Sequence, residues 1–239
     1  MQSSIGETEL RRSDEQCARL HQITHRLERH QFPPPDKGIP TNGLYFMFET
    51  GETAHAGERI VRIGSHTGIG NLAARLREHI TLNKDRSIFR KNIGRALLSK
   101  DHDPFLEVWN LDLTKRMDRQ RHRHLVDRAK QARIERAVSD YIRYHVSFSV
   151  IPARSEDIAL GLERLCIATV SLCGSCRASS SWLGNFSPKP KIRASGLWQE
   201  QHLYGEPVSV EALCTIEELS HTLTKALDSD RAVPKQDSP

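Results

Sequence analysis

Apolar and polar positions along the chain follow periods that predict its helices and strands. Apolar residues recur at helical spacing over residues 17–27, and Ser13-Asp-Glu-Gln16 in front of them has the form of a capping box. We therefore expect a helix from Ser13, with residues 1–12 disordered. Phe32-Pro-Pro-Pro35 should end the helix, because proline has no N–H to donate and restricts the residue before it.

Three short runs have the character of β-strands. Residues 44–48 and 59–63 are rich in aromatic and β-branched side chains, and the polar connection 49–58 between them contains two glycines. This arrangement predicts an antiparallel hairpin. Residues 146–151 alternate apolar and polar positions and are followed by Pro152, which predicts a third strand.

The remaining periodic segments favour helices. The expected helices cover residues 72–80 after Gly68-Ile-Gly70, 87–99, 114–144 as one basic helix or two, a segment opened by Ser155, and 215–227 capped at Thr215. Residues 105–111 fit a strand or a helix, 174–206 are loop-rich, and 228–239 form a polar tail that we expect to be disordered.

These segments together predict an α+β fold. It has a small, mostly antiparallel three-stranded sheet flanked by helices, with helical N-terminal and insertion segments. We divide the chain into a tail and helix (1–36), a main domain (37–206) with a basic helical insertion near 101–140, and a C-terminal helix with a disordered tail (207–239).

Charge is distributed unevenly along the chain. The formal net charge is +5, yet residues 71–100 and 111–136 together carry +11, which leaves −6 for the rest. Such concentration favours a surface that faces a polyanion; ordinary solvated helix faces are the alternative. We find no apolar run of the ~18 residues that a membrane span needs and no signal peptide. With five cysteines, an odd number, we expect a cytoplasmic protein without membrane contact.

Four short motifs occur in order on the predicted elements. They are Gly43-Leu-Tyr45, Arg62-Ile-Gly64 (19 residues later), Arg75-Leu-Arg-Glu-His79 (11 residues after that glycine) and Leu162-Glu163-Arg-Leu-Cys-Ile167. The ordered set resembles the GIY-YIG nuclease superfamily, in a bacterial branch with Arg62 in place of the second tyrosine. The resemblance covers residues 43–170, and the basic stretch near 101–140 would be an insertion within it.

The resemblance implies phosphodiester hydrolysis with a single Mg²⁺ or Mn²⁺ ion. Glu163 would bind the ion, since Mg²⁺ prefers carboxylate and water oxygens. Tyr45 would activate or position water. Arg75 and His79 project from one helix face and would contact the phosphate, where arginine binds two oxygens at once. Taken singly, Tyr45 also fits a core position, Arg75 and His79 a solvated face, and Glu163 a surface charge.

Two positions depart from the family pattern. Arg62 stands where a second phenol is usual; it can bind phosphate, and His66 can supply a hydrogen-bonding or proton-transfer group. The family also has an asparagine a dozen residues after the glutamate, whereas Ser175 stands there. Asn185 and Gln199 are the candidates for an auxiliary amide.

The sequence therefore predicts a Mg²⁺-dependent endonuclease that acts on DNA rather than RNA. Basic side chains would follow the nucleic-acid backbone, which gives affinity without sequence information. The candidates are Arg86, Arg90, Lys91, Arg95, Arg119, Arg121, Arg123 and Arg128. Two alternatives remain open: a nucleic-acid-binding module of the same superfamily that has lost catalysis, and an interaction protein whose basic helices bind an acidic partner.

Cys173-Gly-Ser-Cys176 is a lone C-x-x-C motif. A zinc site needs about four ligands, and no second pair follows at suitable spacing. Cys166 and His202 would join it only if the fold happened to bring them there. We therefore interpret the motif as structural, without a metal.

Overall fold

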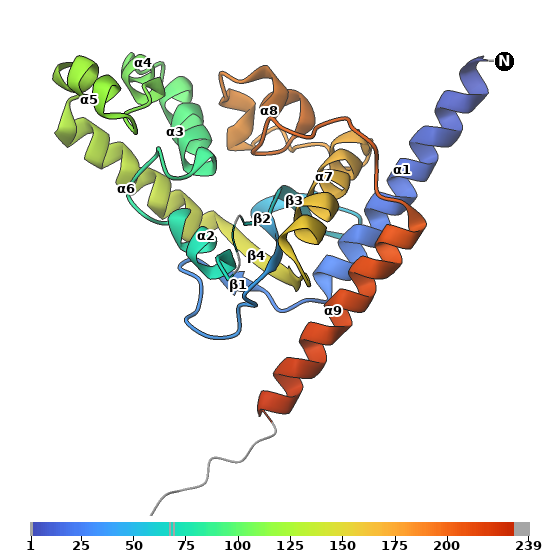
Figure 1. Ribbon diagram of the computed structural model, residues 1–239. Helices are drawn as coiled ribbons and strands as arrows, with labels where there is room; N and C mark the ends of the chain where they lie inside the picture. Colours follow the sequence, from blue (N-terminus) through green and yellow to red (C-terminus); the bar gives the residue numbers. More distant parts are fainter. Residues whose placement is uncertain (1, 67, 69, 232–239) are drawn as a thin grey trace, which may run out of the picture.

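A four-stranded antiparallel sheet lies at the centre of the computed structural model, which describes residues 2–66, 68 and 70–231 (Figure 1). The strand order is β1-β4-β2-β3, with bounds β1 His30–Gln31, β2 Gly43–Ala54, β3 Gly57–Gly64 and β4 Val146–Pro152. The α+β class is confirmed, as are the hairpin and the strand before Pro152. The sheet has one strand more than the three expected. The extra strand β1 is two polar residues long, too short for any alternation, and it pairs with Ser147 and Phe148 of β4.

Helices occupy most of the remaining chain. They are α1 Gln2–His25, α2 Leu72–Glu78, α3 Ile88–Lys100, α4 Phe105–Asn110, α5 Arg116–His122, α6 Arg128–His145, α7 Glu156–Leu172, α8 Pro190–Ser195 and α9 Val210–Arg231, with short 3₁₀ turns η1 Arg123–Leu125 and η2 Leu183–Phe186. The segment that fitted a strand or a helix is α4. The basic stretch forms α5, η1 and α6. Ser155 caps α7 as expected, since its hydroxyl accepts from the Ile158 N–H at 3.3 Å.

The two terminal helices are longer than predicted. Helix α1 begins at Gln2, so the expectation of disorder is wrong for residues 2–12, and Ser13 lies inside the helix instead of capping it. Glutamate, leucine and arginine in this segment are good helix formers. Helix α9 begins at Val210 instead of Thr215, and the Ser209 hydroxyl accepts from the Ala212 N–H at 3.1 Å. Of the expected C-terminal tail, residues 228–231 are helical, and residues 232–239 lie outside the described residues, as does residue 1.

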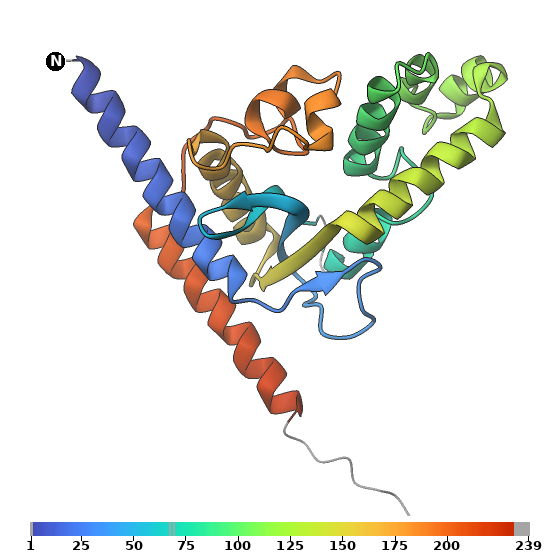
Figure 2. The same cartoon turned by 180° about the vertical axis from the view of Figure 1, so that it is seen from behind.

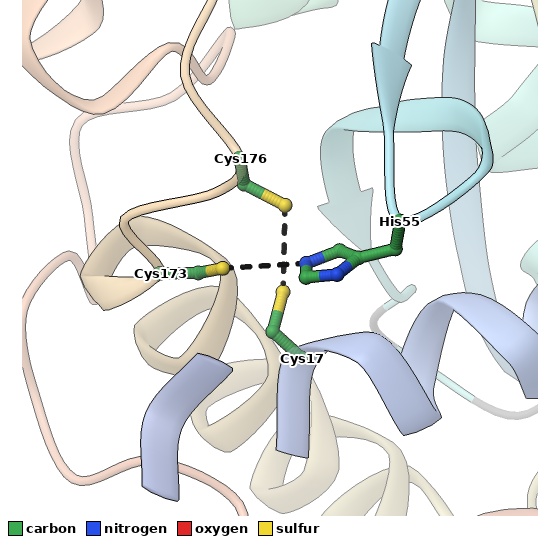
Figure 3. A group of neighbouring side chains, drawn as sticks. All are labelled: Cys17, His55, Cys173 and Cys176. Carbon is green, nitrogen blue, oxygen red and sulfur yellow. Dashed lines mark hydrogen bonds between the residues drawn. The ribbon is translucent and has the colours of Figure 1, made fainter. Parts of the chain in front are cut away.

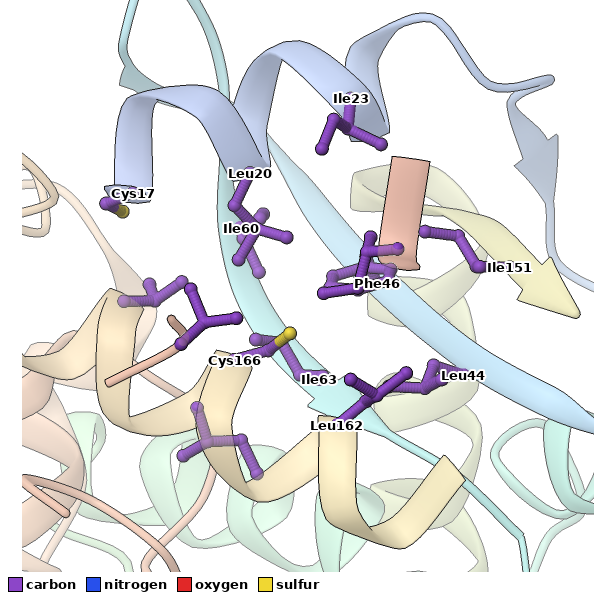
Figure 4. Close-up of a cluster of buried hydrophobic side chains, with 14 of the residues drawn as sticks. Cys17, Leu20, Ile23, Leu44, Phe46, Ile60, Ile63, Ile151, Leu162 and Cys166 are labelled. Atoms are coloured by element: carbon purple, nitrogen blue, oxygen red, sulfur yellow. The ribbon is translucent and has the colours of Figure 1, made fainter. Parts of the chain in front are cut away.

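Both faces of the sheet are covered by helices. Alternation along β2 sends Leu44, Phe46 and Phe48 into one hydrophobic cluster, and Tyr45 and Met47 into another. The first cluster packs against α1, α7 and α9 (Figure 4). The second packs against α2, α3 and α6. Figure 2 shows α1 and α9 side by side on one side of the sheet and the α3–α6 helices on the other.

The free edge of β3 is closed by the segment that follows α8. The Trp198 N–H donates to the Val61 carbonyl at 2.8 Å, and the Gln199 side-chain oxygen accepts from the Ile63 N–H at 3.0 Å. On the same strand, the Ile60 N–H donates to the His21 imidazole at 3.2 Å. These contacts satisfy groups that would otherwise invite pairing with another chain.

Among the helices of the described residues, none has both the length and the apolar composition that a membrane span requires.

Candidate active site

Tyr45 lies near the start of β2 with its ring buried beside Gly64 of β3. The two residues are paired across the strands, and Tyr45 is 1% exposed. A Cβ at position 64 would lie well under 3.0 Å from the Tyr45 hydroxyl oxygen, and one at Gly43 would overlap the Ile151 carbonyl on β4. Two glycines of the sequence motifs therefore make room, one for the tyrosine ring and one for the neighbouring strand.

The Tyr45 hydroxyl belongs to a hydrogen-bonded chain. His79, which directly follows α2, has its Nε2 2.9 Å from the Tyr45 hydroxyl and its Nδ1 2.8 Å from the Ser87 hydroxyl. Ser87 in turn caps α3 by accepting from the Arg90 N–H. Arg75, one helical turn before His79, interacts with the Tyr45 phenol, and its Nη1 contacts Glu78 at 2.8 Å. Three sequence candidates, Tyr45, Arg75 and His79, are thus brought together.

The imidazole of His79 is held neutral. Burial lowers its pKa well below the usual value, and the positive charges of Arg75, Arg62 and Arg90 lower it further. A neutral imidazole donates through one nitrogen and accepts through the other. His79 can therefore accept a hydrogen bond from the Tyr45 hydroxyl at Nε2 while donating one to Ser87 at Nδ1. Of these three arginines, Arg75 and Arg90 are themselves paired with Glu78 and Glu135.

Arg62 reaches the same face of the sheet through a β-bulge. Met47 pairs with Arg62, but Phe48 pairs with Ile60, so Val61 is an extra residue on β3. The bulge places Arg62 on the Tyr45 side, where its Nη1 donates to the Trp198 carbonyl at 2.7 Å and its guanidinium lies 5.4 Å from the Phe89 ring centre.

The charge of Arg62 has no acidic partner among the described residues, although the side chain is only 6% exposed. Its Nε also lacks a hydrogen-bond acceptor there. The two most deeply buried arginines do have acidic partners, since Arg59 pairs with Glu52 and Arg90 with Glu135, each at 2.6 Å, although Arg90 Nε also lacks an acceptor. A buried cation without a counter-charge is costly unless an anion binds there. Arg62 is therefore suited to hold an anionic ligand such as a phosphate group.

Glu163 faces a pocket beside Arg62. The pocket has a volume of about 300 Å³. It is lined by Arg62, Ile63, Ile88, Glu163, Ile167, Gln199, Glu200, Gln201 and His202. The Ser65 hydroxyl, one residue after Gly64, donates to Glu163 Oε2 and so ties α7 to the end of β3. Arg62 and Glu163 therefore line one pocket, whereas Tyr45, Arg75 and His79 do not line it and connect to it through the pairing of Tyr45 with Gly64.

The residues of the pocket fit a divalent cation of the hard type. Glu163, Gln199, Glu200 and Gln201 offer carboxylate and amide oxygens, which are the donors that Mg²⁺ and Mn²⁺ take. Glu163 is held by the Ser65 hydroxyl, and Glu200 contacts Lys189 Nζ at 3.5 Å.

The two candidates for the auxiliary amide lie in different places. Gln199 lines the pocket and is anchored through its oxygen to the Ile63 N–H. Asn185 does not line it; its amide donates to the carbonyls of Ser179 and Ser180 at 2.8 and 3.2 Å, in the loop around η2. The structure therefore brings Gln199, and not Asn185, to Glu163.

His66 is held next to the strand end rather than in the pocket. It is 2% exposed, with Nε2 2.9 Å from the Asn42 side-chain oxygen and Nδ1 3.3 Å from the Gly43 carbonyl. The same Asn42 oxygen accepts from the Gly70 N–H at 2.8 Å. His66 thus fixes the start of β2 and the loop after β3 against each other.

The basic candidates separate into buried and exposed groups. Arg90 is fully buried and bound to Glu135 and Ser139, and Lys91 is 8% exposed and paired with Asp85 at 3.1 Å. Arg95 is equally buried, against Asn92 and Asn110. These three hold α3 to its neighbours and do not reach a surface that could follow a nucleic-acid backbone. The exposed candidates are Arg86, Arg119, Arg121, Arg123 and Arg128.

The sequence did not identify three supporting residues, namely Ser65, Ser87 and Asn42. Each acts through a single hydrogen bond to a candidate: Glu163, His79 and His66 respectively. Ser87 was visible only as the first residue of the expected helix 87–99, and the other two carry no pattern of their own.

A family model described as the GIY-YIG domain matches residues 8–225. The comparison with curated proteins gave no match, and neither did the comparison with solved structures.

Proposed function

Because the chain belongs to the GIY-YIG family, whose domain indicates a nuclease acting on nucleic acid, we propose that it is a Mg²⁺- or Mn²⁺-dependent endonuclease that hydrolyses phosphodiester bonds in DNA. The observation that carries the proposal is the buried, acid-free Arg62 lining one pocket with Glu163. A phosphate between them would supply the missing negative charge and bring its ester oxygens next to a carboxylate.

Each side chain then has a task that its contacts support. Arg62 and Arg75 would bind the non-bridging phosphate oxygens and stabilise the charge that grows on them. If Arg75 donates to the Tyr45 oxygen, the Tyr45 hydroxyl donates to His79 Nε2, and the remaining lone pair of the phenol oxygen would accept a hydrogen bond from the attacking water and position it. Gln199 would align the substrate beside the pocket.

Glu163, held by Ser65, would bind the single divalent ion. When bound, that ion neutralises charge on the leaving oxygen.

The exposed basic side chains would supply affinity for the DNA backbone. Arg86 lies close to the site, since its carbonyl accepts from Arg75 at 3.2 Å. Arg119, Arg121 and Arg123 lie on α5 and η1. As its location we propose the cytoplasm, because none of Cys17, Cys166, Cys173, Cys176 and Cys214 is part of a disulfide.

A second candidate function is DNA binding without cleavage. It is favoured by the position of Asn185, which is committed to the η2 loop and cannot serve the pocket. Incubation of plasmid DNA with the protein in Mg²⁺ or in EDTA distinguishes the two functions, because the second predicts an intact plasmid in both and a mobility shift in either.

Substitution of the proposed ion ligand tests the first function. Glu163→Gln removes a charge with little change of shape, and should abolish Mg²⁺-dependent cleavage while the Kd for DNA stays within about twofold. Asp157→Asn is the matched control, an exposed acid on the same helix α7. Cleavage by Glu163→Gln at the wild-type rate would refute the role of Glu163.

A further inference from the structure

A second group of polar side chains lies far from the pocket, on the α1 side of the sheet. Cys17 comes from α1, His55 from the turn between β2 and β3, and Cys173 and Cys176 from the segment after α7 (Figure 3). Their ligand atoms all lie within 4.8 Å of one another. In Figure 3 the three thiols and the imidazole point towards a common centre.

The spacing of the donor atoms suits one tetrahedral ion. Cys17 Sγ and Cys176 Sγ are 3.4 Å apart, and His55 Nε2 is 3.3 Å from Cys173 Sγ. A zinc ion with Zn–S bonds of about 2.3 Å places its ligand atoms roughly 3.8 Å apart. An iron–sulfur cluster is larger than one ion and would need its thiolates farther apart.

The turn that carries His55 has an unfavourable backbone conformation for its residues. His55 and Ala56 form a two-residue hairpin connection in which both have positive φ, 49° and 62°. Such turns favour Asn-Gly or Gly-Gly, and a β-carbon in this conformation is unfavourable. A contact that depends on the imidazole, here with Cys173, gives a reason for histidine at this position.

The other ligands are also fixed by their surroundings. Cys173 ends α7, and the following Gly174 N–H donates to Asp14 on α1 at 2.8 Å. Cys17, Cys173 and Cys176 are at most 6% exposed. Loss of any one ligand would therefore leave the remaining thiols buried together.

A neighbouring histidine, His21, is already engaged. Its Nδ1 lies 2.9 Å from the Cys17 carbonyl, and its Nε2 accepts from the Ile60 N–H at 3.2 Å. A neutral imidazole has one donor and one acceptor, so both nitrogens are used. His55 is thus the nitrogen ligand, and His21 braces the backbone of Cys17.

We propose that Cys17, His55, Cys173 and Cys176 bind one structural Zn²⁺ ion. Three thiolates and one imidazole form a closed tetrahedral set with no position for water or substrate, which is the usual composition of structural zinc sites. The ion joins α1, the β2–β3 hairpin and the C-terminal end of α7. The partners of the C-x-x-C motif are Cys17 and His55, and not Cys166 or His202, so the metal-free interpretation of this motif is replaced.

Zinc content provides the direct test. The chain is produced in zinc-containing medium and purified without chelators or metal-affinity resin. It should contain one zinc ion per chain when measured by inductively coupled plasma mass spectrometry. Cys17→Ser and Cys176→Ser should contain almost none. Cys214→Ser is the matched control, because this thiol is exposed and lies outside the cluster, and it should keep the full content.

Two further measurements remain decisive if a cysteine variant fails to fold. His55→Asn keeps a residue that tolerates the turn, and should transfer zinc to a chromophoric chelator about tenfold faster than wild type or more. Wild-type protein loaded with Co²⁺ should show thiolate-to-cobalt charge transfer and the visible bands of tetrahedral cobalt. These readouts are independent of DNA cleavage, so an inactive nuclease leaves them unaffected.

Three results would overturn the proposal. They are wild-type protein that binds neither zinc nor tetrahedral Co²⁺, protein that contains iron and sulfide instead, and a Cys17–Cys176 disulfide found by mass spectrometry under non-reducing conditions.

Discussion

At the scale of single residues, the position of Tyr45 depends on the absence of a side chain at Gly64. The tyrosine hydroxyl occupies the space that a Cβ at position 64 would need. It uses that space to reach His79 at 2.9 Å. Any larger residue at position 64 must therefore displace either the strand or the phenol.

Gly64→Ala should separate Tyr45 from His79 and reduce both stability and cleavage. Overpacking of a buried site costs about 1–3 kcal/mol, measurable by urea unfolding. Gly161→Ala is the matched control, because it lies within α7 with nothing within 4 Å of its added Cβ. This control should be neutral or stabilising by up to about 1 kcal/mol. Equal behaviour of the two variants would show that the space beside Tyr45 is not needed.

The neutrality of His79 has a consequence for acid stability. Its pKa is lowered in the folded protein by burial and by Arg75, Arg62 and Arg90, whereas in the unfolded chain it is about 6.5. Above that pH neither state binds the proton. Below it the unfolded state binds a proton that the folded state does not, so the free energy of unfolding falls by up to about 1.4 kcal/mol per pH unit.

His79→Gln removes this titration while keeping an amide near Tyr45. Its free energy of unfolding should therefore fall less steeply than that of wild type between about pH 6 and pH 5. Urea denaturation at several pH values measures both slopes. If the slopes coincide, His79 takes up its proton in the folded protein as readily as in the unfolded one.

At the scale of elements, α5 and η1 differ from the other helices because neither contains a buried residue. Met117 on α5 is 79% exposed and Leu125 on η1 is 50% exposed. Hydrophobic burial therefore contributes little to holding this segment, and its charges can be changed without disturbing the core.

Reversal of Arg119, Arg121 and Arg123 to glutamate should weaken binding to every DNA sequence about equally. Each lost phosphate contact should lower the log–log salt slope by about 0.9. The control is an equal charge change at three exposed residues elsewhere, Lys37, Arg154 and Arg177. Fluorescence anisotropy over a salt series with two unrelated duplexes gives the slopes. An unchanged slope would restrict the DNA surface to the region of Arg86, and a loss that differs between duplexes would indicate base reading.

Helices and strands could be predicted from the sequence where the packing of the fold agrees with the local preference of the residues. Alternation over residues 146–151 and the cap at Ser155 gave β4 and the start of α7 correctly. The β1 strand was missed because two residues carry no period. The interior position of Ser13 was missed because serine and aspartate prefer helix caps, and here the good helix formers before Ser13 extend the helix past that preference.

At the scale of the whole molecule, the two proposed metal sites should respond differently to chelation. Glu163 lines an open pocket, whereas the thiols of the cysteine cluster are buried. Brief EDTA treatment should stop cleavage, reversibly with Mg²⁺, and leave the Tm unchanged. Removal of zinc with a stronger chelator should lower the Tm by roughly 10 °C or more, because each 1 kcal/mol shifts the Tm of a chain this long by about 2–4 °C. An unchanged Tm after zinc removal would contradict a structural ion.

The candidate site was only partly predictable because its members act through contacts between distant segments. Spacing placed Arg75 and His79 on one helix face. It could not foresee that Arg90, eleven residues after His79, would turn inward to Glu135. Nor could it join Cys17 to Cys176, which are separated by 159 positions. Composition describes how much charge or sulfur a chain has, and only the packing of its elements decides which groups meet.

The closing of the β3 edge by Trp198 and Gln199 has a consequence for how the chain is made. Trp198 and Gln199 are made 137 and 136 positions after Val61 and Ile63, which they cover, so until then the edge of β3 is covered only where Ile60 bonds to His21. Unfinished chains that end before Trp198 would have an unpaired edge on β3 that can pair with other chains, and an incomplete pocket. Such fragments should be the ones that chaperones retain, and the pocket for a phosphate would be complete only after Trp198 and Gln199 have been made.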